Sequence, residues 1–234
     1  MIVFDMAGTT VNEDNIVYKT LMKSINKIGG FDLELDEVLA HGAGKEKLQA
    51  IIAILKNCLA VEDQQLAESI FSFFLQELKH AYQVEDIFPG TNAHKLFEIL
   101  KSKGILRVLN TGYDRSTAEF LLAKLNWEVG KDIDGLVTAS DVPRNRPFPD
   151  MIIAAMEKFD IGNPLCVVKV GDSAIDIQEG QNAGCALSIG ITTGAHTQAQ
   201  LSEAGPDYII NDLVELIEII SQYEEVKLPR ASAN

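Results

Sequence analysis

Four short segments of this 234-residue chain carry side chains suited to phosphoryl chemistry. In chain order they supply a carboxylate, a hydroxyl, a cation and a second carboxylate, at Asp5, Thr111, Arg146 and Asp172. In phosphoryl transfer one carboxylate attacks phosphorus, another helps to hold a divalent metal, and the hydroxyl and cation bind the remaining oxygens. Hard oxygen ligands favour Mg2+. The residue types therefore predict magnesium-dependent phosphoryl chemistry, with an aspartyl-phosphate formed on one of the two aspartates.

The segments that must position these side chains alternate between strand-like and helix-like patterns. Residues 1–4 form an apolar run that predicts a buried strand ending at Asp5, and the alternation starts after Gly90. Such alternation predicts a mostly parallel sheet covered on both faces, and ligands bind beyond the carboxyl ends of its strands. The expected strands are 105–109, 135–139, 166–170, 186–189 and 208–210, and the expected helices are 93–102, 116–125, 150–159, 175–183, 197–203 and 213–221.

Residues 11–85 interrupt the alternation with a segment in which we expect helices and no strand. Apolar residues keep helical spacing at 16–28, 45–59 and 63–82. The sequence thus predicts an α/β fold with a Rossmann-like parallel-sheet core and an inserted all-helical cap. The expected boundaries place the core at 1–10 and 86–226, the cap at 11–85 and a C-terminal tail at 227–234.

The charge balance argues against two classes of partner. Twenty Lys and Arg against 34 Asp and Glu give a formal net charge of −14, which disfavours nucleic acid and anionic membrane surfaces. No run of about 18 apolar residues occurs, and Asp5 lies where a signal peptide would still be apolar. Three widely separated cysteines make neither a disulfide framework nor a CxxC clamp. We expect a cytoplasmic protein, as a monomer or homodimer, with no nucleic-acid or membrane partner.

The motifs resemble, in the same order and over essentially the whole chain, those of the haloacid dehalogenase-like hydrolases. The resemblance extends to the phosphonatase branch, the phosphonoacetaldehyde hydrolases and their relatives. The segments that carry it are DMAGTT at 5–10, TGY at 111–113, DVP at 141–143, RPFP at 146–149, KVGD at 169–172 and EGQNAG at 179–184.

The resemblance implies a role for each matching residue. Asp5 is the expected nucleophile, and Thr111 and Arg146 are expected on the phosphoryl oxygens, with backbone N–H groups admitted by Gly8 and Gly112. The expected substrate is a small phosphonate or phosphate. The residues expected to hold Mg2+ are Asp5, Ala7 through its backbone carbonyl, Asp172 and Asp176.

Ala7 stands where most phosphatases of the superfamily carry a second aspartate, which protonates the leaving alkoxide. Cleavage of a C–P bond instead needs an electron sink, which phosphonatase obtains when a cap lysine forms an imine (Schiff base) with the substrate aldehyde. The segment HGAGK at 41–45 places Lys45 at the matching position, near the start of an expected helix, whose dipole lowers the pKa of an amine. His41 and Tyr113 are expected near the carbonyl end of the substrate.

Three positions depart from the phosphonatase pattern: His41 replaces a methionine, Leu48 a histidine and Asn15 a cysteine. The phosphoryl half of the site therefore matches better than the half that would recognise an aldehyde. Two alternatives remain open beside a C–P hydrolase. One is a phosphatase acting on a small phosphomonoester, and the other is a metal-binding or interaction protein with little turnover, which the missing acid at Ala7 permits.

Overall fold

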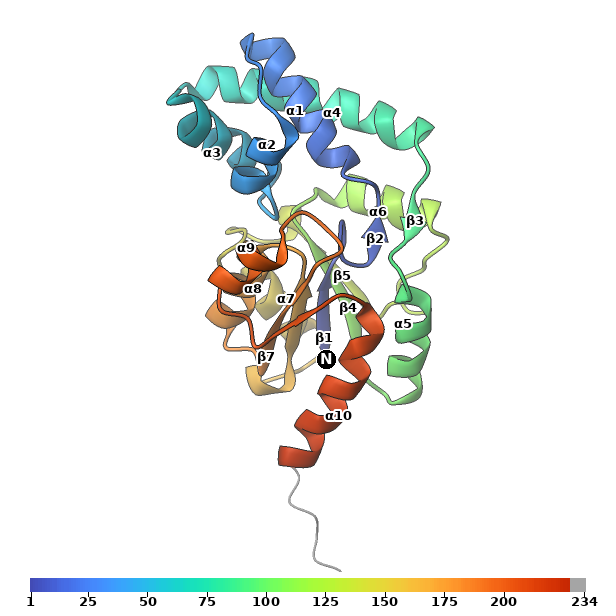
Figure 1. Ribbon diagram of the computed structural model, residues 1–234. Coiled ribbons are helices and arrows are strands. Elements are labelled where there is room, and N and C mark those ends of the chain that lie inside the picture. The colour runs from blue at the N-terminus through green and yellow to red at the C-terminus, as the bar shows by residue number, and fades with distance from the viewer. Residues whose placement is uncertain (228–234) are drawn as a thin grey trace, which may run out of the picture.

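The computed structural model describes residues 1–227, with side chains described through Tyr223. A helical body lies above a sheet with helices on both sides (Figure 1). The expected tail lies outside the described residues apart from Lys227, which ends the last helix. None of the described helices combines the length and the apolar character needed to cross a membrane.

Six parallel strands form the central sheet in the order β5-β4-β1-β6-β7-β8. The α/β fold class is thereby confirmed. The strands are β1 (Ile2–Asp5), β4 (Arg107–Thr111), β5 (Gly135–Thr138), β6 (Val168–Gly171), β7 (Leu187–Ile191) and β8 (Tyr208–Ile210).

The central strand β1 shows how the sheet is held between two apolar layers. Ile2 and Phe4 point into the cluster that also receives α5 and α10, whereas Val3 points into a second cluster built mainly on α7. Successive side chains of a strand face opposite sides, so a strand buried on both faces is apolar throughout. The helices of this body are α5 (Ala93–Ser102), α6 (Arg115–Lys124), α7 (Asp150–Lys158), α8 (Ala174–Ala183), α9 (Gln198–Glu203) and α10 (Leu216–Lys227), with short 3-10 turns at Ala139–Asp141, Pro164–Cys166 and Leu213–Glu215.

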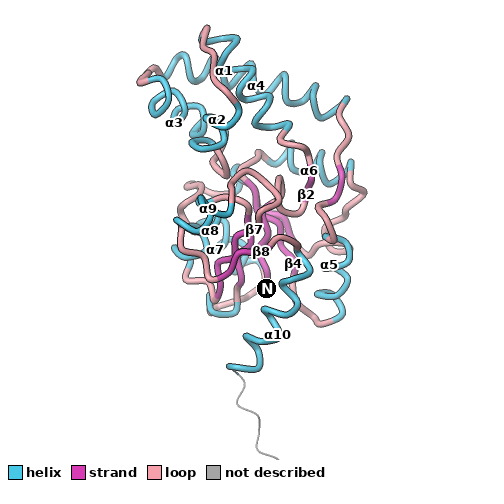
Figure 2. Tube along the Cα trace, in the orientation of Figure 1, coloured by secondary structure: helices cyan, strands magenta, loops and turns pink. Residues whose placement is uncertain are grey.

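The helical body consists of four helices inserted after β1. α1 packs along α4, and α2 packs on α3. A two-stranded antiparallel ribbon of β2 (Val11–Asn12) and β3 (Phe88–Pro89) connects this body to the sheet (Figure 2). The helices are α1 (Ile16–Gly29), α2 (Leu35–Gly42), α3 (Lys47–Leu59) and α4 (Gln64–Val84).

Local capping explains where the structure differs from the sequence expectations in the helical body. The helix α2 was not expected, and it begins in a capping box in which Glu34 and Glu37 satisfy each other's backbone N–H. The expectation that a helix begins at Lys45 is wrong by two residues, because the Glu46 side chain accepts the N–H groups of Leu48 and Gln49 and so makes Glu46 the N-cap. Lys45 therefore lies in the connecting loop. The ribbon strand β2 (Val11–Asn12) is also an exception to the expected absence of strands at 11–85.

In the sheet, the expected strand at 166–170 begins later, at Val168, because Pro164–Cys166 forms a 3-10 turn. The carboxyl ends of β1, β4 and β6 lie side by side, since β1 pairs with both of the others and Asp5 is opposite Asn110. Asp5 and Thr111 end their strands, and Asp172 follows β6 directly. The parallel pairing therefore brings three of the four chemistry-bearing segments to one edge.

The interior of the helical body depends on the apolar face of α4, which allows a direct test. Phe74 is fully buried, whereas its neighbour Leu75 is 39% exposed. Phe74→Ala is expected to lower the free energy of unfolding by about 3–5 kcal/mol, through lost burial and a residual cavity. Leu75→Ala, measured by the same chemical denaturation, should cost less than about 1 kcal/mol. Equal losses would contradict this packing.

Candidate active site

The expected nucleophile lies at the carboxyl end of the central strand, bound to the expected cation. Arg146 donates from Nη1 to Oδ1 of Asp5 at 2.7 Å. Both side chains are buried, with Asp5 only 5% exposed. Burial raises the pKa of Asp5, and the Arg146 guanidinium opposes that rise. Arg146 is therefore not the surface loop residue that its Pro-rich context could suggest, but the group that fixes one oxygen of the carboxylate.

Arg146 also joins the nucleophile to a second set of buried acids. Its Nε donates to Glu179 at 2.9 Å, and its Nη2 donates to the backbone and side-chain oxygens of Asn110. Its Nη1 lies 3.0 Å from Asp176 Oδ1. These contacts occupy every edge of the guanidinium, so Arg146 supports Asp5 as a rigid plate.

Lys169 is a second buried cation in the same cluster. It is fully buried, and its Nζ lies 2.9 Å from Asp176, 3.4 Å from Glu179 and 2.7 Å from the Asn110 side-chain oxygen. From the sequence, Lys169 was noted only as part of the KVGD motif, with no role of its own. A charged residue inside the apolar run 167–170 was the signal that a buried partner must exist.

Asp176 is held by protein partners on both of its oxygens. Oδ1 forms ion pairs with Arg146 and Lys169, and Oδ2 accepts the hydroxyl of Ser173. These cations lower the pKa of Asp176 against the effect of burial. The structure thus places Asp176 in the ion-pair cluster, next to Arg146 and Lys169, and its expected role in holding a metal stays a prediction.

Asp172 is the acid whose charge is least compensated. It is 4% exposed, and its Oδ2 accepts the backbone N–H of Ala195 at 2.6 Å. Among the described residues no lysine or arginine forms an ion pair with it. Burial raises its pKa well above the usual range, and the negative charges of Asp5 and Asp176 raise it further. A buried carboxylate in this position requires a proton or a cation.

The uncompensated buried charge of Asp172 is the observation that indicates a metal ion at this site. Four buried carboxylates face two buried cations, Arg146 and Lys169, which leaves two negative charges that one divalent cation would balance. Residues 1–227 contain no ready cage of three or more His, Cys, Asp or Glu side chains. A site built from Asp5, Asp172 and the Ala7 carbonyl has only two such side chains, and Mg2+ commonly completes its shell with water.

The remaining expected phosphoryl-binding groups surround this acid pair. Thr111 is buried, and its Oγ1 accepts the N–H of Tyr113 at 3.2 Å, which leaves its hydroxyl proton for another acceptor. Gly8 has a φ of +82°, and a Cβ there would lie 2.4 Å from Asp172 Oδ2. The Gly8 N–H, however, donates to Val11 within its own turn. The role of Gly8 is thus close approach to Asp172, whereas its N–H is already used.

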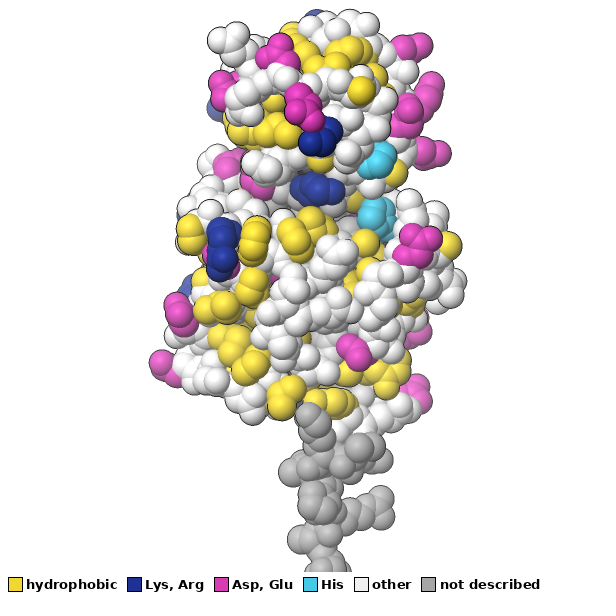
Figure 3. All heavy atoms as spheres, turned by 90° about the vertical axis from the view of Figure 1, so that its left-hand side faces the viewer, with side chains coloured by type: hydrophobic (Ala, Val, Ile, Leu, Met, Phe, Trp, Pro, Cys, Tyr) yellow, Lys and Arg dark blue, Asp and Glu magenta, His cyan; other side chains and the backbone are white. Residues whose placement is uncertain are grey.

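The loop between α2 and α3 presses the helical body onto this site. A Cβ on Gly112 would lie 2.9 Å from the Lys45 carbonyl oxygen, and one on Gly44 would lie 2.3 Å from the Ser173 hydroxyl. Arg146 Nη1 also contacts the Gly44 carbonyl at 3.4 Å. Figure 3 shows Lys or Arg side chains gathered with His side chains at the waist where the two bodies meet. Only glycine fits at 44 and 112 without moving one body away from the other.

Lys45 and His41 lie at this seam. Lys45 is half-buried, and its Nζ donates to the His41 carbonyl oxygen at 2.6 Å, across the end of α2. Burial lowers the pKa of Lys45. The structure brings these two expected residues together, although through the backbone of His41 and not through its imidazole.

A lysine that the sequence analysis did not single out lies deeper than Lys45. Lys47 is 7% exposed, and its ammonium lies over the rings of Tyr18 and Tyr113, at 5.1 and 5.3 Å from their centroids. Burial lowers its pKa to about 8, against the attraction of Asp5. The sequence did not predict its burial, because a lysine in the charged triplet KEK at 45–47 is normally expected to be solvent-exposed. Its position at the start of α3 is known only from the structure.

Glu13 adds a buried acid beside this lysine. Its Oε2 accepts from Val17 N–H at 2.9 Å and from the Tyr82 hydroxyl at 3.0 Å. The Tyr82 hydroxyl in turn lies 2.7 Å from that of Tyr113. Burial raises the pKa of Glu13 to about 7, and burial keeps both phenols far above their usual pKa. The site thus has one polar wall from the sheet and another from the helical body.

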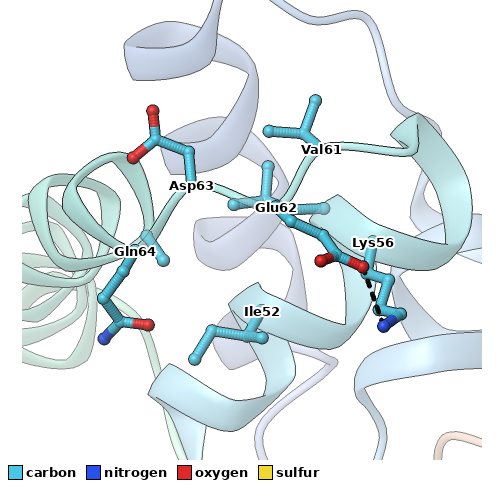
Figure 4. Close-up of a pocket in the computed structure, with 8 residues that line it drawn as sticks. Ile52, Lys56, Val61, Glu62, Asp63 and Gln64 are labelled. Atoms are coloured by element: carbon cyan, nitrogen blue, oxygen red, sulfur yellow. Dashed lines mark ion pairs between the residues drawn. The ribbon is translucent and has the colours of Figure 1, made fainter.

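Surface pockets of the molecule border the site at Tyr82, between α4 and α6, and elsewhere lie away from it. One of about 280 Å3 lies between α3 and the start of α4, where an exposed Lys56–Glu62 ion pair of 2.8 Å borders it (Figure 4). None of its lining residues belongs to the strand-end site. The buried state of Asp5 and Asp172 therefore shows the two bodies closed over the nucleophile.

Comparison with known proteins identifies the family of this arrangement. The family model for haloacid dehalogenase-like hydrolases matches residues 1–184. The chain belongs to this hydrolase family. The phosphonoacetaldehyde hydrolase of Latilactobacillus sakei is 28% identical over 95% of both chains, and the pyrophosphatase PpaX of Bacillus mycoides is 24% identical over 94% of this chain and 96% of its own. The crystal structure of a phosphonoacetaldehyde hydrolase-like protein from Oleispira antarctica, at 21% identity, superposes with a TM-score of 0.81 over 94% of this chain and 91% of its own.

Membership of the haloacid dehalogenase-like hydrolases confirms the resemblance read from the motifs and makes this protein a hydrolase. The structural match confirms the Rossmann-like fold.

The buried cluster predicts a sharp stability difference between two ion pairs. Lys169→Met leaves Asp176 and Glu179 short of a cation in the interior, so we expect a loss of about 3–5 kcal/mol in the free energy of unfolding. The matched control is Lys131→Gln at the exposed pair with Glu128, and its unfolding midpoint should not move. Comparable losses in chemical denaturation would contradict the cluster's role.

Glu13 predicts a pH dependence of stability with a definite sign. Its pKa is raised from 4.5 to about 7 in the folded state, so the native protein binds more protons than the unfolded chain across that window. Its contribution is complete below pH 4.5 and is lost as pH rises through about 7, by on the order of 3 kcal/mol. Glu13→Gln should flatten this part of the stability curve. An unchanged slope in denaturation between pH 4.5 and 7 would refute the assignment.

Proposed function

We propose that this hydrolase is magnesium-dependent and transfers the phosphoryl group of a small phosphonate, phosphonoacetaldehyde or a close relative, to Asp5 and then to water. The observation that carries the proposal is the pairing of two features. The nucleophile loop has Ala7 where an acid for an alkoxide leaving group would stand. The helical body brings lysine amines to the same site. A carbon leaving group needs an amine, because the imine that the amine forms accepts the electron pair of the C–P bond. An acid, in contrast, serves to protonate a leaving oxygen.

Asp5 is prepared for attack by its contacts. Because Arg146 holds Oδ1, the other carboxylate oxygen is the one available to phosphorus. Mg2+, when bound by Asp5, Asp172 and the Ala7 carbonyl, would offset the repulsion between these acids and the anionic substrate. The Thr111 hydroxyl, whose oxygen accepts the Tyr113 N–H, would donate its proton to a phosphoryl oxygen. Closure of the helical body excludes water until the phosphoryl group has reached Asp5.

The carbonyl half of the reaction falls to a lysine of the helical body. The amine condenses with the aldehyde and releases water, and the protonated imine then accepts the electron pair of the C–P bond while phosphorus bonds to Asp5. The motif nominates Lys45, and the lowered pKa of Lys45 supports an amine that can be neutral. Hydrolysis of the imine and of the aspartyl-phosphate completes the cycle.

A phosphatase acting on a small phosphoester is the second candidate. The near full-length likeness to a pyrophosphatase favours it. It predicts faster phosphate release from esters or pyrophosphate than from phosphonoacetaldehyde.

A phosphate-release screen tests the proposal. With Mg2+ the wild-type protein should release phosphate from phosphonoacetaldehyde faster than from a panel of phosphoesters, and a chelator should abolish the activity until Mg2+ is restored. Asp5→Asn should lower the rate on the order of 10⁴-fold, as removal of a nucleophile does. The exposed Asp160→Asn is the matched control and should retain full activity. Activity in Asp5→Asn, or release from esters alone, would refute the C–P hydrolase.

A further inference from the structure

The start of α3 places a second lysine, not the one in the motif, at the favourable end of the helix. Glu46 is the N-cap, so Lys47 is the first residue of α3. The positive end of the helix dipole acts there on its amine. Lys45 lies outside the helix, in the loop that follows α2. The helix dipole, which was expected to act on the amine of Lys45, therefore acts on the amine of Lys47.

The surroundings of the Lys47 amine come from both bodies of the protein. Its Nζ donates to the Lys45 carbonyl oxygen at 3.0 Å. The two rings under it are Tyr18, on α1 of the helical body, and Tyr113, which follows β4 in the sheet. Among the described residues no carboxylate forms an ion pair with Lys47. The amine is thus buried in an aromatic cradle that orients it without locking it as a paired ammonium.

The electrostatic reach of the nucleophile distinguishes the two lysines. The charges of Asp5 and Arg146 both act on the pKa of Lys47, as does that of Glu13. Burial alone acts on that of Lys45, whose Nζ is directed to the His41 carbonyl instead. Of the two amines, that of Lys47 is therefore the one on which the charge of Asp5 acts, whereas Lys45 contributes its backbone carbonyl to the seam over Gly112.

We propose that Lys47, in its cradle of Tyr18 and Tyr113, is the amine that forms the imine with the carbonyl of the phosphonate substrate. The inference rests on the proposed C–P hydrolase function. Neutral Lys47 attacks the carbonyl carbon, one proton is taken up from solvent and water leaves, giving a protonated imine. The C–P electron pair moves into the imine as phosphorus bonds to Asp5, giving an enamine. The enamine carbon takes a proton from water, and a second water hydrolyses the imine to free Lys47 and release the aldehyde.

Reductive trapping on the wild-type protein tests the assignment without a variant. Borohydride is added during turnover of phosphonoacetaldehyde with Mg2+, which converts an imine into an N-ethyl or N-phosphonoethyl lysine. Fragmentation of a non-tryptic peptide separates the two candidates, because Glu46 lies between them. We expect the adduct on Lys47. An adduct on Lys45, or phosphate release with no adduct on either lysine, would overturn the assignment and leave the hydrolase function standing.

Variants provide the kinetic counterpart. Lys47→Arg keeps the positive charge but forms no imine, so kcat/KM for phosphonoacetaldehyde should fall about 100-fold or more, with the adduct lost. Lys45→Arg should retain the Lys47 adduct. The matched control is Lys56→Arg, an exposed position on the same helix, with activity unchanged. Near wild-type activity in a folded Lys47→Arg would overturn the inference. No phosphate release by the wild type would instead refute the proposed function itself.

Discussion

The contact between Arg146 and Asp5 is the constraint on which the rest of the site depends. A buried carboxylate costs several kcal/mol unless a partner compensates its charge, and a buried guanidinium needs acceptors on every edge. One ion pair in the interior therefore requires others: Asp176 and Glu179 accept from Arg146, and Lys169 balances those two acids. The cluster ties β1, β6, α8 and the loop before α7 into a rigid base. The nucleophile is positioned by this network and not by the short strand β1 alone.

The closure of the helical body follows from the absence of side chains at two glycines. The loop around Gly44 lies against Ser173, and Gly112 lies against the Lys45 carbonyl, so a single Cβ at either position would collide with the opposite body. This seam brings the two tyrosines that hold Lys47 together from different bodies. With Asp5 and Asp172 almost inaccessible, substrate entry requires that the bodies separate, and the narrow β2/β3 ribbon is the connection about which they can do so. Binding and closure are therefore coupled in this fold.

The parallel core could be predicted because the spacing of apolar residues that marks strands and helices is visible in short stretches of sequence. The site segments could be predicted because the carboxyl ends of parallel strands lie at one edge of the sheet. Asp5, Thr111 and Asp172 were found in this way, and the structure places them together. The ion pairs of Asp176 could not be predicted from spacing, because its partners Arg146 and Lys169 come from different segments and only the folded sheet brings the three into contact. The beginning of α3 was missed for a different reason. The spacing of apolar residues alone does not show which residue caps a helix. The Glu46 side chain accepts the N–H groups of Leu48 and Gln49, and α3 therefore begins at Lys47.

The two-residue shift at that helix start has a consequence larger than its size. On the loop, the amine of Lys45 is held by the His41 carbonyl, whereas the first residue of a helix has its backbone direction set by the turns that follow. In this protein the Lys47 ammonium lies over two aromatic rings, one from each body. The chain has a net charge of −14, which repels an anionic substrate. Binding such a substrate therefore depends on a few buried cations. Which lysine becomes one of them is decided by capping and burial, and a motif match by itself does not identify it.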